Sequence, residues 1–228
     1  MKKQKINNQN VLRFVTGVGI FSALAFVVAA VCEVIPNVAG FLSIDVKDAI
    51  IAIASFIYGP VAAPVISLIV AAVELVTIGS DTSWYGFVMN FVSSASFSLV
   101  ASLIYSYRKN INTALVGFFA AIATTTGMML LMNTFVTPVY VRIMGIPFDV
   151  IEHLPTLFLP FNFAKYLLNG AVAMLLYKPI INGLRRARII PRSEHKSVFN
   201  KNTVIILSVG GAFLVISVLM FIYLLIKW

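Results

Sequence analysis

The chain has 228 residues, of which 60% are hydrophobic and 11% are charged, and its mean hydropathy is +0.97. Soluble globular domains carry about a quarter charged residues, so the composition excludes a soluble protein and indicates an integral membrane protein surrounded by a lipid bilayer. The net charge of +9 is interpreted as a topology signal, and nucleic acid is therefore not expected as a partner.

Six stretches of the sequence are long and apolar enough to cross a membrane as helices, which requires about 20 residues. They are residues 11–35, 60–78, 85–107, 114–140, 157–184 and 203–226. The first has no small-residue cleavage site after it, so we interpret it as a retained helix and not as a signal peptide. A shorter stretch, residues 48–58, predicts a half-length or tilted helix.

The basic residues predict the orientation in the membrane. When successive loops are assigned to alternate sides, thirteen of the 17 Lys and Arg residues fall on one side, three fall on the other, and Lys165 lies inside a span. The basic side is cytoplasmic, so the N-terminus is predicted to be cytoplasmic. This assignment requires residues 48–58 to cross, because otherwise Arg108 and Lys109 move outside. Seven of the eight acidic residues then lie outside, where we expect the chemistry of the protein.

The first predicted span carries a surface of small residues that includes Ala25 and Ala29. Small residues four positions apart let another helix approach closely. The pattern fits packing inside the bundle and docking of a partner helix equally well.

The two outer loops and the span that follows them carry candidate binding groups. Residues 41–48 alternate apolar and polar side chains and predict an extended lid over the mouth of the protein. Asp48 precedes an apolar run, so we expect it to cap the short helix. Trp84 and Tyr85 fit ligand stacking or, with preference, the interfacial aromatic belt. Asn90 begins a weakly polar stripe that fits ligand binding or hydrogen bonds between helices.

A second polar stripe lies at the outer end of residues 114–140. Asn133, Thr137 and Tyr140 are spaced i, i+4 and i+7 and therefore share one helical face. Thr137 fits an interhelical hydrogen bond as well as it fits binding. For Asn133, which lies at the expected depth of Lys165, binding is favoured.

Lys165 lies in an apolar span, where a charged side chain costs roughly 3 kcal/mol or more. Asn162 and Asn169 share its helical face, and an ammonium flanked by amides is typical of a pocket for a polar, planar small molecule. We expect an outer carboxylate as its counter-ion, above all Glu74. The alternative is that Lys165, about 7 Å below the outer end of its helix, reaches outer water.

The sequence lacks the motifs of energy conversion and catalysis. It contains no glycine-rich phosphate loop, HExxH helix or GxSxG elbow, so the chain is predicted neither to hydrolyse ATP nor to be an enzyme. The single cysteine, Cys32, excludes an internal disulfide. His153 and His195 lie far apart in predicted loops, so no metal site is expected.

Five segments occur in a characteristic order between residues 14 and 184. They are FLSID at 41–45 with Asp48, YGP at 58–60, NF at 90–91, LMNTFVTPVY at 131–140 and LPFNFAK at 159–165. This set resembles the substrate-binding S components of energy-coupling-factor (ECF) vitamin transporters, most closely the riboflavin-specific members.

The resemblance implies an all-α integral membrane protein of the bacterial cell membrane, with a six-helix S-component bundle. Such a bundle captures riboflavin, as a transported ligand and not a cofactor, at the outer face. It docks on a transmembrane coupling subunit driven by two cytoplasmic ATPase subunits, and the resemblance assigns Ala25 and Ala29 to this docking. Together with the polar stripes, it predicts these ligand-binding residues: Leu42, Ser43, Asp45, Asn90, Asn133, Thr137, Tyr140, Asn162 and Lys165.

Two departures from the family pattern keep other ligands open. Ser43 stands where the family usually has Lys, and Val76-Thr77 stand where it has Lys-Asn. The alternatives are an S component for pantothenate, folate or thiamine, or a structural or regulatory membrane protein that binds no small molecule. The predicted parts are residues 1–190 as the S-component bundle, 191–202 as a polar cytoplasmic linker and 203–228 as an extra C-terminal transmembrane helix.

Overall fold

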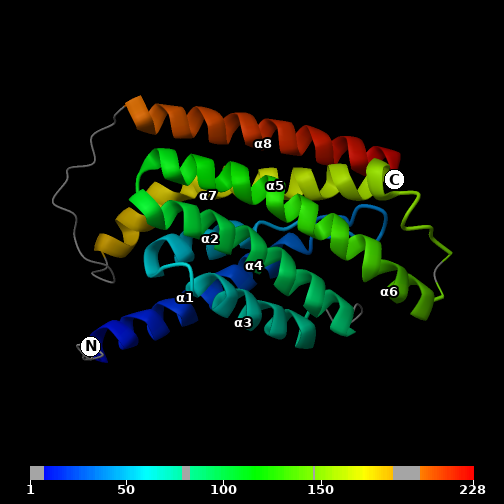
Figure 1. The fold of residues 1–228 in the computed structure, drawn as a ribbon, viewed down its shortest axis with the longest axis horizontal. Helices are drawn as coiled ribbons and strands as arrows, with labels where there is room; N and C mark the ends of the chain where they lie inside the picture. Colours follow the sequence, from blue (N-terminus) through cyan, green and yellow to red (C-terminus); the bar gives the residue numbers. More distant parts are fainter. Residues whose placement is uncertain (1–7, 79–82, 146, 187–200) are drawn as a thin grey trace.

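The computed structural model describes residues 8–78, 83–145, 147–186 and 201–228, and within these ranges the regular structure is helical (Figure 1). The elements are α1 (Asn8–Cys32), α2 (Lys47–Tyr58), α3 (Ala62–Val76), α4 (Ser83–Arg108), α5 (Ile111–Phe135), α6 (Thr137–Ile143), the π-helical turn η1 (Leu154–Phe158), α7 (Leu159–Arg186) and α8 (Lys201–Lys227). The all-α prediction is confirmed. His195 and most of the predicted linker lie outside the described residues.

Five segments of the described chain are long and apolar enough to cross a membrane, namely Val11–Cys32, Trp84–Arg108, Asn112–Ile143, Leu154–Tyr177 and Val204–Lys227. Each corresponds to a predicted span. The predicted span at residues 60–78 is shorter in the structure, because α3 has 15 residues and a helix of that length covers only about 22 Å. The span predicted at 114–140 is divided at Val136, after which the short helix α6 begins with Thr137 and Pro138.

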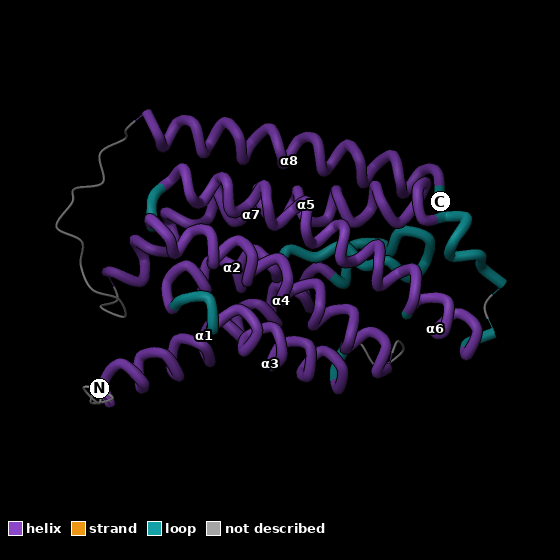
Figure 2. The backbone as a smooth tube through the Cα atoms, viewed as in Figure 1, coloured by secondary structure: helices purple, strands orange, loops and turns teal. Residues whose placement is uncertain are grey.

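The helices run alternately up and down along a common long axis (Figure 2). At one end of the bundle α1 begins, α2 turns into α3, α4 turns into α5, and α7 ends. We call the opposite end, where α1, α5 and α8 end and α4 and α7 begin, the pocket end. Since α2 reverses the chain direction, Arg108 lies at the same end as the start of α1. The change of chain direction at residues 48–58, which the count of basic residues on each side required, is therefore present.

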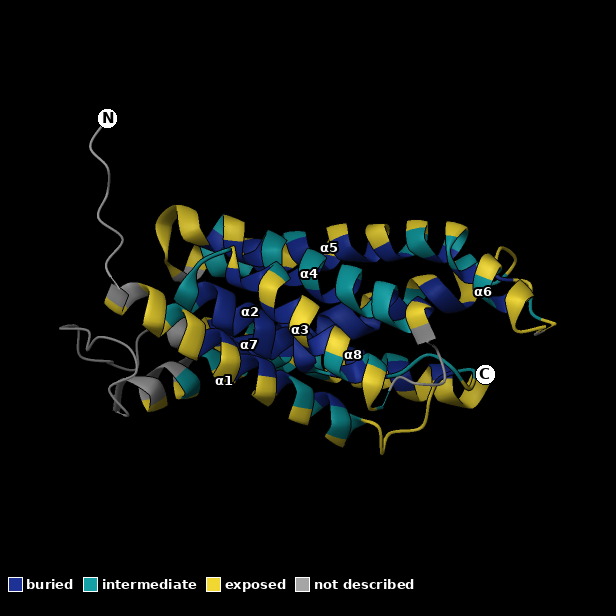
Figure 3. Ribbon diagram, turned by 90° about the horizontal axis from the view of Figure 1, so that it is seen from below, coloured by how far each residue is buried: buried dark blue, intermediate teal, exposed yellow. Residues whose placement is uncertain are grey.

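Burial separates the interior of the bundle from its outer faces (Figure 3). Ala25 and Ala29 are 0% and 4% exposed, and α1 packs against α2 and α3. The prediction that these two alanines form a docking face for a partner does not fit this structure, because both side chains point into the bundle. The exposed face of α1 instead carries large apolar residues such as Val15, Val27 and Val31.

Helix α8 is an additional helix that packs along α7. The residues on its contact face are spaced three or four positions apart, and they include the buried residues Ser217, Phe221 and Leu224. Gly210 lies at the interface, where a Cβ atom would come within 3.4 Å of Met174 on α7. The opposite face of α8 is exposed and apolar, as expected for a helix that contacts lipid.

Gly117 lets α5 approach α4 closely, because a Cβ atom there would lie 2.8 Å from the backbone oxygen of Ala101. We expect Gly117→Ala to destabilise the bundle by about 1–3 kcal/mol through this backbone clash. Thermal unfolding of the detergent-purified protein measures the effect. Gly127→Ala on the same helix is the matched control, since a Cβ atom there meets nothing within 4 Å. Equal stabilities of the two variants would contradict the close approach.

Candidate functional site

A cavity of about 110 Å³ lies at the pocket end between α4, α5, α7 and the loop after α1. Its polar lining includes Ser93 and five predicted residues, namely Ser43, Asn90, Asn133, Asn162 and Lys165. Its aromatic lining comes from Phe41, Tyr85, Phe161 and Tyr166. Amides, hydroxyls and an ammonium together with aromatic rings match the chemistry of a planar ligand with carbonyl groups.

A second cavity of about 350 Å³ borders the first. Phe41, Ser43 and Asn90 line both cavities and therefore stand between them. The second cavity is more strongly charged, because Asp45, Lys47, Glu33 and Glu74 contribute to its lining, together with Tyr140. The two spaces thus combine an aromatic and amide-rich part with a charged part.

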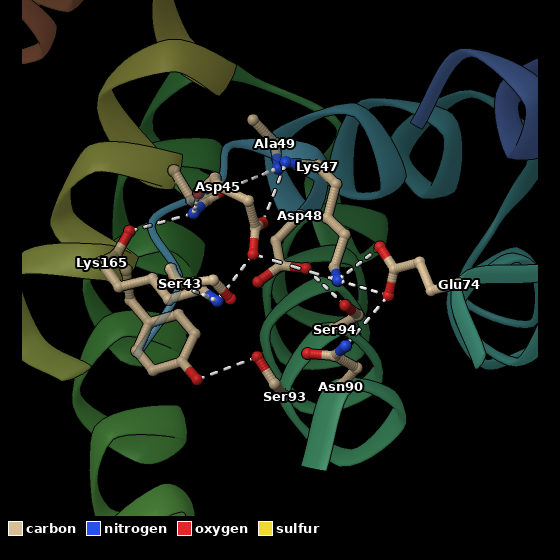
Figure 4. Close-up of polar contacts among 12 residues, drawn as sticks. Ser43, Asp45, Lys47, Asp48, Ala49, Glu74, Asn90, Ser93, Ser94 and Lys165 are labelled. Carbon is tan, nitrogen blue, oxygen red and sulfur yellow. Dashed lines mark hydrogen bonds and ion pairs between the residues drawn. The ribbon is translucent and has the colours of Figure 1, made fainter. Parts of the chain in front are cut away.

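Lys165 is paired with Asp45 at the centre of the site (Figure 4). Its Nζ donates to Asp45 Oδ2 at 2.7 Å and to the backbone oxygen of Ser43 at 3.4 Å. The residue is only 6% exposed, so the alternative that its ammonium reaches outer water is wrong. The expectation that Glu74 is its counter-ion is also wrong, because the carboxylate paired with the ammonium is that of Asp45 on the loop before α2.

Glu74 instead pairs with Lys47, whose Nζ lies 2.7 Å from both carboxylate oxygens. Asn90 Nδ2 donates to Glu74 Oε2 at 3.0 Å. Lys47 Nζ also lies 3.9 Å from Asp45 Oδ2, so four buried charges alternate in sign from Lys165 through Asp45 and Lys47 to Glu74. We call these four residues the charge chain.

The charge chain keeps its loop carboxylate ionised. Burial opposes ionisation of Asp45, but the ammonium groups of Lys165 and Lys47 outweigh it and hold the pKa of that carboxyl below its usual range. The backbone amide of Lys47 also donates to Asp45 Oδ1. Asp45 therefore links Lys165 on α7 electrostatically to Lys47 at the start of α2.

The predicted capping role of Asp48 is not what the structure shows. Helix α2 begins at Lys47, its N-cap is Val46 and no side chain caps it there. Asp48 lies in the first turn and accepts a hydrogen bond from Ser94 on α4. Asn169 on α7 bonds the helix start instead: its Oδ1 accepts from Ala49 N at 2.9 Å, and its Nδ2 donates to the backbone oxygen of Asp45 at 2.9 Å.

Thr137 makes a hydrogen bond between helices, which was the alternative to ligand binding. It donates to Asn133 Oδ1 at 2.8 Å and shares a 2.8 Å hydrogen bond with the hydroxyl of Tyr85, and it lines neither of the two cavities. Tyr85 is buried and stacks on Tyr140 with 4.2 Å between ring centroids, so it does not belong to an interfacial belt. Trp84, at 52% exposure, fits that belt.

The loop before α2 is integrated into the core and does not lie across the mouth as an extended lid. An antiparallel bridge joins Val38 and Leu42, and Ile44 is buried. Leu42 lines the first cavity, Ser43 lines both cavities, and Asp45 and Tyr140 line the second. Of the aromatic lining, Tyr85 was considered for ligand stacking, but Phe161 and Tyr166 were not predicted, because single aromatic residues in an apolar span carry no distinguishing pattern.

Residues 13–181 match the family described as the substrate-specific component of ECF transporters. The chain is 30% identical over 190 residues to the riboflavin transporter RibU of Staphylococcus aureus (strain TCH60), covering 81% of this chain and 98% of that protein. It is 27% identical over 181 residues to the riboflavin transporter FmnP of Bacillus subtilis (strain 168), covering 75% and 95%.

A solved structure of the S component of a bacterial ECF transporter has the same fold. The TM-score is 0.63 at 26% sequence identity, and the match covers 76% of this chain and 98% of that one. Both the sequence and the structural matches thus span nearly the whole of their relatives. Helix α8 lies beyond the residues that match the family.

The pairing of Lys165 with Asp45 predicts a specific pattern of stabilities. Lys165→Met should destabilise the protein by about 3–5 kcal/mol, because it leaves a buried carboxylate without its closest partner. Adding Asp45→Asn should restore much of this loss, since the remaining Lys47 and Glu74 still pair. Thermal unfolding of both variants measures the difference, with Lys109→Met, an exposed residue at the other end, as control. A double variant as unstable as the sum of its single changes would refute the pairing.

Proposed function

Because this chain belongs to the substrate-specific components of ECF transporters, we propose that it is the subunit that captures riboflavin or a related flavin for uptake. It binds the vitamin and releases it chemically unchanged. The proposal rests on one observation above all: amides, an ammonium and aromatic rings converge on one cavity in a chain similar to two riboflavin transporters.

The chemistry of the first cavity suits the flavin ring. The imide edge of a flavin presents alternating donors and acceptors, which the amides of Asn133 and Asn162 match. The ammonium of Lys165 donates to a carbonyl or ring nitrogen, and the rings of Phe161 and Tyr166 cover the apolar faces. Departures of Ser43 and Val76 from the family pattern thus leave the central flavin-binding groups in place.

The size of the site requires both cavities. Small-molecule sites usually measure about 300–1,000 Å³, and the first cavity, at about 110 Å³, is too small alone. A flavin seated in it extends its hydroxylated side chain past Phe41 into the second cavity. There the carboxylates and the ammonium of the charge chain accept and donate hydrogen bonds to hydroxyl groups.

Transport requires partners under this proposal. The chain carries no phosphate-binding loop, so a transmembrane coupling subunit and two cytoplasmic ATPase subunits supply the energy. The basic end of the bundle, with the N-terminus, faces the cytoplasm of a bacterial cell, and the pocket end faces outward. Ala25 and Ala29 are buried and do not provide the docking surface, which therefore includes other residues.

Flavin binding is the direct test. We expect the detergent-purified protein to bind about one riboflavin per chain with quenched flavin fluorescence. Asn133→Ala should weaken the affinity about 5- to 150-fold, because it leaves a buried polar group of the ligand unpaired. Asn112→Ala, which removes an exposed amide on the same helix, should not change it. Tight binding of another vitamin and none of riboflavin would redirect the proposal to that ligand.

The requirement for partners gives a second test. Proteoliposomes that contain the chain alone should bind riboflavin without accumulating it. Liposomes that also contain a coupling subunit and two ATPase subunits should accumulate it when ATP is supplied. Accumulation at the full rate by the chain alone would contradict the assignment as an S component.

A further inference from the structure

Helix α8 reaches the pocket end beside the segment that joins α6 to η1, although it lies beyond the family match at residues 13–181. We propose that α8 positions Phe41 through Trp228 and so slows the release of the bound ligand. The inference rests on the proposed flavin-binding function and extends it. Trp228 and His153 are thus positioning residues, which act on the ligand through other side chains.

A continuous series of ring contacts connects α8 with the cavity wall. The ring centroid of Trp228 lies 4.9 Å from that of His153 in an edge-to-face arrangement. His153 stacks on Phe148 at 4.7 Å, and Phe148 meets the edge of Phe41 at 5.6 Å. These separations lie in the range in which aromatic rings attract each other beyond simple burial.

The position of Phe41 determines how the two cavities communicate. Its side chain lines both of them, and its ring rests on Phe148 and Phe158. A flavin that occupies both cavities lies against this ring. Any change that loosens Phe148 therefore loosens the wall that holds the ligand.

Hydrogen bonding and packing hold the part of the aromatic series next to α8. His153 is held by a 2.6 Å hydrogen bond between its Nδ1 and the backbone oxygen of Asp149. On α8, Leu224 is fully buried and Phe221 packs against Phe161 of the first cavity at 5.9 Å. The backbone amide of Trp228 donates to the backbone oxygen of Leu224 at 3.0 Å, so α8 presents the Trp228 ring to His153 from the end of this packed stretch.

The test is the kinetics of flavin release, measured by stopped-flow fluorescence on the full chain. Trp228→Ala should raise the dissociation rate constant roughly 2- to 10-fold, the effect expected from losing one aromatic contact. Trp228→Phe should retain the slow release, since it keeps a ring. Tyr223→Ala removes an exposed ring on the same helix and is the matched control, with an expected rate equal to that of the unaltered protein.

A second variant distinguishes positioning from general loss of stability. His153→Ala should speed release to a similar extent, and combining it with Trp228→Ala should add little, because both changes interrupt the same series. Melting temperatures should stay close to that of Tyr223→Ala. Release at the normal rate from both Trp228→Ala and His153→Ala would overturn this inference and leave the proposed function standing. If the unaltered protein binds no flavin, the proposed function fails, and the inference fails with it.

Discussion

The need to neutralise charge inside an apolar bundle is the constraint on which the site depends. Lys165, Asp45, Lys47 and Glu74 alternate in sign, and each is buried. A buried ion without a partner is strongly destabilising, so the segments that carry these residues must come together. The charge chain thereby ties α7, the loop after α1, the start of α2 and α3 into one arrangement.

This arrangement also shapes the pocket. Once Asp45 is bound to Lys165, the preceding residues Phe41 to Ser43 line the cavity, and Asn169 fixes the first turn of α2. The loop is consequently part of the binding wall and part of the core. The position of this loop is thereby linked to the ion pairs of the charge chain.

Helix α8 lies beyond the family match and packs beside the candidate site. The relatives are matched over nearly all of their length, and the family match ends at residue 181, before α8 begins. The helix packs on α7 along an apolar seam and ends at the aromatic segment next to Phe41. Its contact with the site is indirect, through rings, which suits an effect on ligand release better than an effect on ligand identity.

The sequence by itself determined the membrane class, most helices and the main polar cavity residues. Long apolar runs form helices in lipid regardless of their neighbours, and Asn133 and Lys165 were identified because polar groups are rare there. Tertiary structure alone decided the pairings. Asp45 and Lys165 are 120 residues apart, and local spacing does not show which carboxylate meets an ammonium. For the same reason, only packing decided that Ala25 and Ala29 face inward and that Asn169, not Asp48, bonds the start of α2.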